Sequence, residues 1–343
     1  MKKIFARIIV GLLLLLSWKT ALAQEIPKDV SYLLGMYYGN GSQFLIRENQ
    51  GRLELVYRFD GDDKDFSGSN VYPLKKEHFD SYTINEVGPI MGTEAAVRFE
   101  RDSAGRGITC SVGGKRFSRY FYPGQKDNEN RFPSVNNADQ LAKAAAEAVE
   151  PPALQKGTAA QLVNLAAAVP NLKVDLRYGS ANNLFGRPLY EGAKAYASTE
   201  TAAALKIAAQ LLNAKGYGLL VWEAYRPWSA SKLAYDLLPA DGKGMLPAPE
   251  KGDVHNTGLA VDVSLYDLKT GLPLPMISDY DEISPRQYPH YAGSSSSLRF
   301  LRDYLAEVMQ KAGFKASGME WWHFSLNEGA GYAKLNLPFS SLQ

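Results

Sequence analysis

Two short segments of this 343-residue chain contain half of its four histidines. Residues 253–262 read Asp-Val-His-Asn-Thr-Gly-Leu-Ala-Val-Asp, and residues 320–323 read Glu-Trp-Trp-His. Two histidines and one carboxylate form a known catalytic zinc set whose fourth position is left open to water. If His255, Asp262 and His323 share one metal ion, the fold must bring these two distant segments together. This requirement constrains the C-terminal half of the chain more than any other feature.

The surroundings of Asp262 support a metal site. Aliphatic and small residues alternate over 259–265, which predicts a strand with Asp262 on the face of the small residues. An ionised carboxylate in so apolar a segment is costly unless it is paired or bound to a metal. The alternative is an aspartate that caps a nearby turn, with His255 on the surface. The second segment favours the metal, because Glu320 is left over to accept a proton from a water that zinc acidifies.

A third candidate group follows the apolar run at residues 217–222, which predicts a strand. Residues 223–227 read Glu-Ala-Tyr-Arg-Pro, and the ends of strands often hold catalytic groups on a rigid scaffold. Arg226 keeps its charge and presents forked donors, which suit the oxyanion of a tetrahedral intermediate. The alternative is an ion pair of Arg226 with Glu223 or a surface carboxylate, and without the zinc motif this alternative would be preferred.

The first 23 residues have the pattern of a secretory signal peptide. A basic start is followed by an apolar run at residues 8–16 and by small residues at 21–23. The alternative, an uncleaved membrane anchor, is less favoured because a bilayer span needs roughly 20 apolar residues. We therefore predict an exported protein, periplasmic or secreted, whose mature chain begins at Gln24 and has no membrane span.

Charge and cysteine content narrow the function further. Removing the four basic residues of the signal peptide changes the formal net charge from +2 to −2, which offers no electrostatic basis for binding nucleic acid. Cys110 is the only cysteine, so the exported chain has no internal disulfide and depends on its hydrophobic cores. Nothing around Cys110 suggests an activated thiol, and we expect it to be free and buried.

Residues 24–135 are predicted to form a β-rich accessory domain. Short runs of β-branched and aromatic residues at 43–46, 53–59 and 96–100 alternate with turn sequences, which indicates a small antiparallel sandwich or barrel. No chemical constellation is found there, and His78 is expected to be an ordinary surface residue. This domain could bind a ligand, tether the protein or stabilise it.

The rest of the chain is predicted to be α+β. An alanine-rich helix and a Pro-Pro stop make residues 136–157 a helix and linker, and residues 158–343 form the second domain. Helices and strands mix there without a regular βαβ order, which favours an antiparallel sheet. Helices are expected at 159–168, 199–214, 228–238 and 298–312, and strands at 172–178, 217–222, 259–265 and 321–326.

The two histidine segments also match family motifs. The pattern S-x-H-x-x-G-x-A-x-D is matched, except for its serine, at residues 253–262, and E-x-x-H is matched at 320–323. Further matches lie at 174–178, 183–188, 225–227, 274–276 and 280–281. With these motifs, residues 158–330 resemble the zinc D-alanyl-D-alanine dipeptidases, which include the vancomycin-resistance dipeptidase and are related to the zinc D,D-carboxypeptidases. The resemblance implies a D,D-peptidase (hedgehog-like) fold for the second domain.

The resemblance further implies roles for individual residues. One Zn²⁺ per chain would be held by His255, Asp262 and His323. Glu320 would be the general base, and Arg226 would stabilise the transition state.

A second group would bind the substrate. Asp281 is implied to receive the free ammonium group, together with a serine that is replaced here by Asp253. Asp253 either pairs with the ammonium as a second acid or faces solvent. Tyr225, in the motif that contains Arg226, is also assigned to substrate binding. His290 is not expected to be a ligand.

These assignments predict a zinc dipeptidase that hydrolyses D-Ala-D-Ala or a close D,D-dipeptide, so its partner is a small dipeptide. An ammonium held by Asp281 would restrict cleavage to dipeptides, because a longer chain has an amide at that place. The nearest alternative is a D,D-carboxypeptidase that trims muropeptide stems in an open cleft. A wall-binding or zinc-binding module without catalysis is less favoured, because binding alone needs neither Glu320 nor Arg226.

Overall fold

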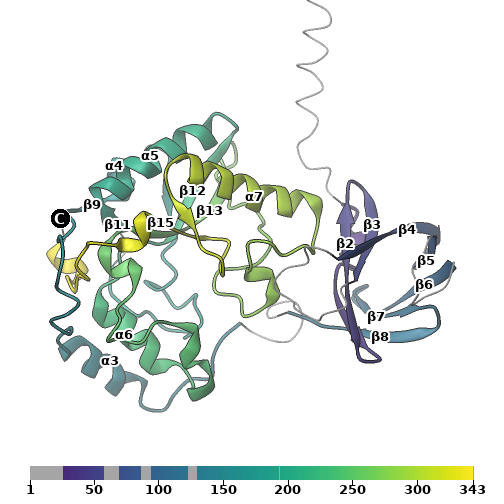
Figure 1. Ribbon diagram of the computed structural model, residues 1–343, viewed down its shortest axis with the longest axis horizontal. Helices are drawn as coiled ribbons and strands as arrows, with labels where there is room; N and C mark the ends of the chain where they lie inside the picture. Colours follow the sequence, from purple (N-terminus) through teal and green to yellow (C-terminus); the bar gives the residue numbers. More distant parts are fainter. Residues whose placement is uncertain (1–25, 58–68, 86–93, 123–129, 193, 343) are drawn as a thin grey trace, which may run out of the picture. The chain divides into compact units, whose positions relative to one another are not determined.

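The computed structural model describes residues 26–57, 69–85, 94–122, 130–192 and 194–342. The predicted signal peptide at residues 1–23 lies outside them. The chain divides into two compact units (Figure 1): the first is Met1–Tyr120 with Ala292–Phe300, and the second is Phe121–Tyr291 with Leu301–Gln343. Residues 121–122 and 130–135, which were predicted to belong to the β-rich domain, thus fall in the second unit. Among the described helices, none combines the length and the apolar character that a membrane span requires.

The first unit is a closed antiparallel barrel, which confirms the barrel form of the predicted sandwich or barrel. Each strand pairs with the next along the chain, and β8 pairs with β1 to close the ring, with Arg119 opposite Tyr37. A short helix, α2 (Lys28–Ser31), precedes the strands. These are β1 (Gly35–Gly39), β2 (Ser42–Asn49), β3 (Arg52–Tyr57), β4 (Asn70–His78), β5 (Ser81–Asn85), β6 (Glu94–Arg101), β7 (Gly107–Val112) and β8 (Lys115–Arg119).

Aliphatic and aromatic side chains together fill the interior of the barrel. Tyr37 stacks on Phe44 with ring centroids 5.6 Å apart, and Phe44 meets Phe117 edge to face at 4.8 Å. Cys110 lies in the same core as a free thiol, and burial raises its pKa well above the usual range, as expected for an inert cysteine. His78 is exposed at the end of β4. The barrel is therefore held by a packed core of aliphatic and aromatic side chains and not by a disulfide.

The second unit is built on a five-stranded sheet in the order β10-β12-β13-β15-β14. β10 runs parallel to β12, whereas the other neighbours are antiparallel, so the predicted antiparallel sheet is correct except at one edge. Every residue of β12 is buried, which explains its apolar sequence. The strands are β10 (Lys173–Val174), β12 (Tyr217–Glu223), β13 (Ala260–Asp267), β14 (Lys315–Ala316) and β15 (His323–Ser325).

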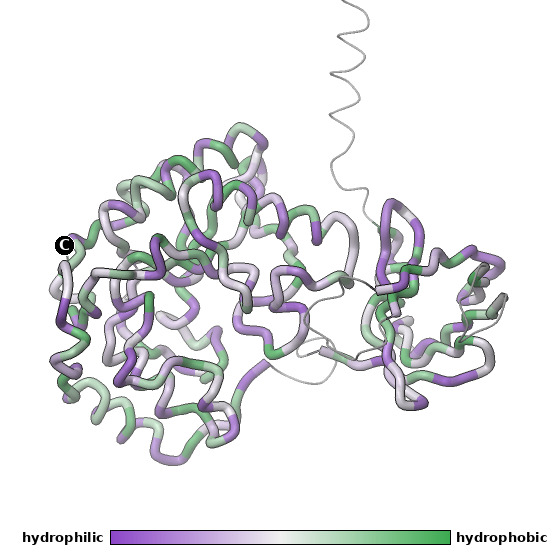
Figure 2. Tube along the Cα trace, in the orientation of Figure 1, coloured by the Kyte–Doolittle hydropathy of each residue, from purple (hydrophilic) through white to green (hydrophobic). Residues whose placement is uncertain are grey.

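Helices surround this sheet in the second unit. α5 contacts β12 and begins, as predicted, at Thr199; the hydroxyl of the preceding Ser198 caps it by accepting a hydrogen bond from the Thr201 amide at 3.0 Å. α3 lies beside α6 (Figure 1). Figure 2 shows hydrophobic and hydrophilic residues mixed along these helices, as expected for helices with one buried face. Their bounds are α3 (Ala138–Glu147), α5 (Thr199–Asn213), α6 (Trp228–Leu237) and α7 (Ser296–Lys311), of which the part from Leu301 onward belongs to this unit.

Two elements of the second unit are shorter than predicted. The helix expected at 159–168 is reduced to α4 (Leu165–Ala168), because Leu162–Asn164 form β9 and pair with β11 (Tyr196–Ser198). The Asn164 side chain accepts a hydrogen bond from the Ala166 amide and so starts the helix only there. Of the strand expected at 172–178, only the two residues of β10 form a strand. In both cases, pairing with a distant strand decided what local propensity could not.

Candidate active site

β13 and β15 bring the two histidine segments together. Asp262 on β13 lies directly opposite His323 on β15 in the antiparallel register. His255 comes from the short 3-10 helix η2 (Val254–Thr257), which ends at Gly258 with a left-handed φ of 75°. A Cβ at Gly258 would lie 2.6 Å from a leucine side chain, so both the conformation and the packing require glycine.

Three potential ligand atoms meet at this point. His323 Nδ1 is 2.9 Å from Asp262 Oδ1. His255 Nε2 is 3.2 Å from His323 Nδ1 and 3.4 Å from Asp262 Oδ2. A tetrahedral zinc with bonds of about 2.0–2.1 Å would hold its ligand atoms about 3.3 Å apart. The structure therefore brings together the three side chains predicted from the sequence, at separations that fit one metal ion.

Neighbouring groups orient these side chains. His255 Nδ1 is 2.8 Å from the carbonyl oxygen of Ala224, which can only accept, so Nδ1 carries the hydrogen and the lone pair of Nε2 faces the centre. The Tyr280 hydroxyl donates to Asp262 Oδ2 at 2.9 Å. Hydrogen bonds of this kind fix the tautomer and rotamer of metal ligands.

The electrostatics of the cluster favour a bound cation. Burial would raise the pKa of Asp262, but the neighbouring histidines hold it well below its usual range. Burial would lower the pKa of His323, but its hydrogen bond to Asp262 raises it to about 9. The ionised, buried carboxylate is therefore stable only beside a positive charge, and a metal ion can supply that charge.

Glu320 precedes β15 and is not one of the three converging groups. Burial raises the pKa of the Glu320 carboxyl to about 7, and the negative charge of Asp262 acts in the same direction. A carboxyl group with a pKa near neutrality can both accept and return a proton. These properties suit the role of general base that was predicted for it.

Arg226 is paired with Asp253, not with Glu223 or a surface carboxylate. Its Nη2 donates to Asp253 Oδ2 at 2.6 Å and its Nε donates to Ser231 Oγ at 3.0 Å, and both ionic side chains are buried. Asp253 Oδ1 also accepts from the His255 amide at 2.8 Å, which caps η2. Of the two alternatives left open for Asp253, the one in which it faces solvent is therefore wrong. Asp253 joins Arg226 to the loop that carries His255.

Replacing Asp253 with Asn should destabilise the protein by about 3 kcal/mol, because Arg226 would stay buried without its anionic partner. The amide oxygen of Asn can still cap η2, so the change isolates the ion pair. Urea unfolding of the variant and the unmodified protein measures the difference. Asp241→Asn, at an exposed position in η1 (Ala240–Met245), is the control and should have no effect. Equal stability of Asp253→Asn and the unmodified protein would contradict the expectation.

Asp281 has a left-handed backbone with φ of 52°, which is unusual for a residue other than glycine and is common at functional sites. Its Oδ2 accepts a hydrogen bond from the Tyr178 hydroxyl at 2.6 Å. Burial raises the pKa of Asp281 well above its usual range, and the negative charge of Glu320 acts in the same direction. Asp281 is thus close enough to sense the predicted general base, and an ammonium ion would relieve the repulsion between them.

The Tyr225 hydroxyl is engaged by the C-terminal segment and is not free to bind a substrate. Its hydroxyl donates to the Leu337 carbonyl at 3.0 Å and accepts from the Leu337 amide at 2.8 Å. Its ring is buried and packs near Phe339 at 5.9 Å between centroids. Tyr225 therefore has a structural role and not the predicted substrate-binding role, because its hydroxyl already donates one hydrogen bond to the C-terminal segment and accepts another from it. His290 is exposed and is not one of the converging residues, as expected.

Two residues close to the site were not singled out from the sequence as functional. Glu223 is fully buried, and its Oε1 accepts from the Tyr190 hydroxyl at 2.8 Å, while its Oε2 has no hydrogen-bond partner among the described residues. Burial raises the pKa of Glu223 to about 7, against the opposing effect of Arg226. A glutamate inside an otherwise apolar strand was the available signal. Tyr280 had a weaker signal, its position beside Asp281.

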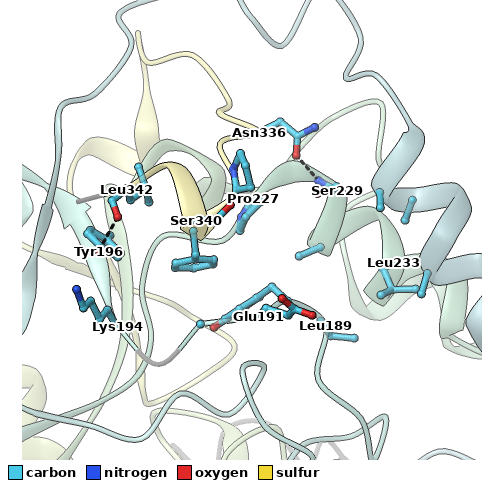
Figure 3. A pocket seen from close by; sticks show the side chains of 18 residues that line it. Leu189, Glu191, Lys194, Tyr196, Pro227, Ser229, Leu233, Asn336, Ser340 and Leu342 are labelled. Atoms are coloured by element: carbon cyan, nitrogen blue, oxygen red, sulfur yellow. Dashed lines mark hydrogen bonds between the residues drawn. The ribbon is translucent and has the colours of Figure 1, made fainter.

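A cavity of about 700 Å³, shown in Figure 3, has Tyr190 among its lining residues. It lies between α3, α6, residues 189–192 and the C-terminal segment, where Asn336 accepts a hydrogen bond from the Ser229 amide at 2.9 Å. Neither the three converging side chains nor Glu320 line this cavity. The cavity in Figure 3 is therefore lined by other residues than those of the candidate active site.

Comparisons with known proteins cover the second unit only in part. The family model described as D-ala-D-ala dipeptidase matches residues 158–341. A D-alanyl-D-alanine dipeptidase of Escherichia coli K12 is 29% identical over 180 residues, which are 52% of this chain and 92% of the relative. A D-alanyl-D-alanine dipeptidase of Enterococcus faecium is 31% identical over 181 residues, which are 47% of this chain and 88% of the relative. The barrel and α3 lie outside the matched residues.

Proposed function

This chain belongs to the D-Ala-D-Ala dipeptidase family, and from that premise we propose that it hydrolyses D-alanyl-D-alanine with a zinc ion held by His255, Asp262 and His323. The observation that carries the proposal is the convergence of these three side chains, whose ligand atoms all lie within 4.8 Å of one another. Nitrogen and carboxylate ligands in this number suit a catalytic zinc site.

A bound zinc ion would supply Lewis-acid chemistry, acidifying a water molecule and polarising the peptide carbonyl. Glu320 accepts a proton from the attacking water as the new C–O bond forms. When the C–N bond breaks, Glu320 returns that proton to the departing amine of D-alanine. Arg226 pairs with the negative charge that develops on the carbonyl oxygen. Its guanidinium is preorganised for this by Asp253 and Ser231.

Asp281 holds the free ammonium group of the substrate in this proposal, which makes substrate length its sharpest test. D-Ala-D-Ala should be cleaved at least about tenfold more efficiently than its N-acetylated form or a pentapeptide stem, because an amide cannot replace the ammonium beside a buried carboxylate. The measurement is kcat/KM for the three substrates, with the zinc content of the protein determined in parallel. Preference for the pentapeptide would instead indicate a D,D-carboxypeptidase.

We also propose that the protein acts outside the cytoplasm. The support is the sequence of residues 1–23, which has the basic, apolar and small-residue regions of a signal peptide. N-terminal sequencing of the protein recovered from its native compartment should start at Gln24.

A further inference from the structure

The chain ahead of the family match reaches the turn that carries Asp281. Asn130 lies in the second unit, outside the matched residues 158–341. Its Nδ2 donates to the Asp281 carbonyl oxygen at 3.0 Å, and its Oδ1 accepts from the Ile283 amide at 3.1 Å. One side chain thus bridges the two limbs of the turn.

The turn needs such a bridge. A non-glycine residue with a positive φ is held there only when its surroundings fix the conformation. The φ of 52° at Asp281 aims its carboxylate at the Tyr178 hydroxyl. Tyr280, the preceding residue, donates to the metal-site carboxylate of Asp262. A small change in this backbone would therefore move the Asp281 carboxylate relative to the zinc site.

The same segment also supports the side-chain end of Asp281. The Phe132 amide donates to the Leu184 carbonyl at 2.8 Å, which places the Phe132 ring beside Phe185 at 6.1 Å between centroids. Phe185 in turn lies 6.1 Å from the ring of Tyr178. Asn130 therefore fixes the backbone of Asp281 directly. Phe132 packs, through Phe185, behind Tyr178, whose hydroxyl donates to the Asp281 carboxylate.

We propose that the segment at residues 130–132 is a positioning element for the substrate-ammonium site, with Asn130 as its main contact; this inference rests on the proposed function. Asn130 does not touch the substrate. It holds Asp281 at the distance from the zinc site that selects a dipeptide. Residues 130–132, which lie ahead of the residues shared with the family, thereby contribute to the preference of this chain for dipeptides.

The test compares Asn130→Ala with Asn136→Ala in the full chain. Asn136 is an exposed asparagine six positions further along the same segment and makes no side-chain hydrogen bond within the described residues, so it is the matched control. Loss of two hydrogen bonds should raise KM for D-Ala-D-Ala roughly tenfold, with kcat changed by less than about threefold and zinc content unchanged. The preference for D-Ala-D-Ala over its N-acetylated form should fall by a similar factor, because a displaced carboxylate no longer discriminates between them.

Hydrogen–deuterium exchange of the peptide that covers 279–285 is a readout independent of activity. Exchange there should become faster in Asn130→Ala and stay unchanged in Asn136→Ala. Unchanged KM, preference and exchange in Asn130→Ala would overturn the inference, and so would a loss of kcat with general unfolding. If the unmodified protein fails to cleave the dipeptide, the proposed function fails, whereas the exchange comparison still decides whether Asn130 holds the turn.

Discussion

Glu320→Gln should lower kcat for D-Ala-D-Ala by about 10³-fold or more while one zinc per chain remains bound. Glutamine has the shape of glutamate but cannot accept a proton, so the change removes the base and keeps the packing. Glu320 is not among the three side chains that converge on the metal, and zinc binding should therefore survive. Steady-state kinetics and metal analysis of the same sample measure both quantities.

Glu307→Gln is the matched control, because Glu307 is an exposed glutamate on α7 whose side chain pairs only with Lys311 among the described residues. It should leave kcat and zinc content unchanged. Normal turnover in Glu320→Gln would remove Glu320 as the base. Loss of zinc together with turnover would instead give Glu320 a role in holding the metal.

The sequence predicted that His255, Asp262 and His323 converge, and strand register accounts for two of the three. The alternation at 259–265 places Asp262 on one face of β13, and the short β15 has a single residue, His323, directly opposite it. Gly258 signalled the turn that η2 needs, and its φ of 75° agrees. Motif spacing and strand periodicity were sufficient to predict that these three side chains converge, since each lies at a regular position of a local element.

Interactions between distant segments were beyond what local patterns could reveal. The pairing of Arg226 with Asp253 depends on how η2 packs beside the end of β12, and the sequence offered Glu223 as a nearer partner. Tyr225 was misassigned for the same reason, because its hydroxyl partner Leu337 is far along the chain. β9 likewise formed where alanine residues favoured helix, since its partner β11 could not be read from local propensity.

His255→Ala should reduce bound zinc from one per chain to close to zero and abolish turnover of D-Ala-D-Ala. The physical reason is that His255 Nε2 completes the three-ligand set with Asp262 and His323, and two protein ligands hold zinc poorly. His290→Ala is the matched control, because His290 is exposed and does not belong to the convergent group. Metal analysis after dialysis against a weak chelator measures the zinc content of each variant.

Thermal unfolding separates loss of the metal from loss of the fold. With EDTA present, His255→Ala should unfold at a somewhat lower temperature than the unmodified protein, because the buried imidazole no longer donates to the Ala224 carbonyl. Added zinc should raise the Tm of the unmodified protein and of His290→Ala, since a ligand that binds only the native state stabilises it. It should leave the Tm of His255→Ala unchanged. If His255→Ala kept a full zinc complement, the ion would have to be held elsewhere, and the register of β13 with β15 would no longer explain the chemistry.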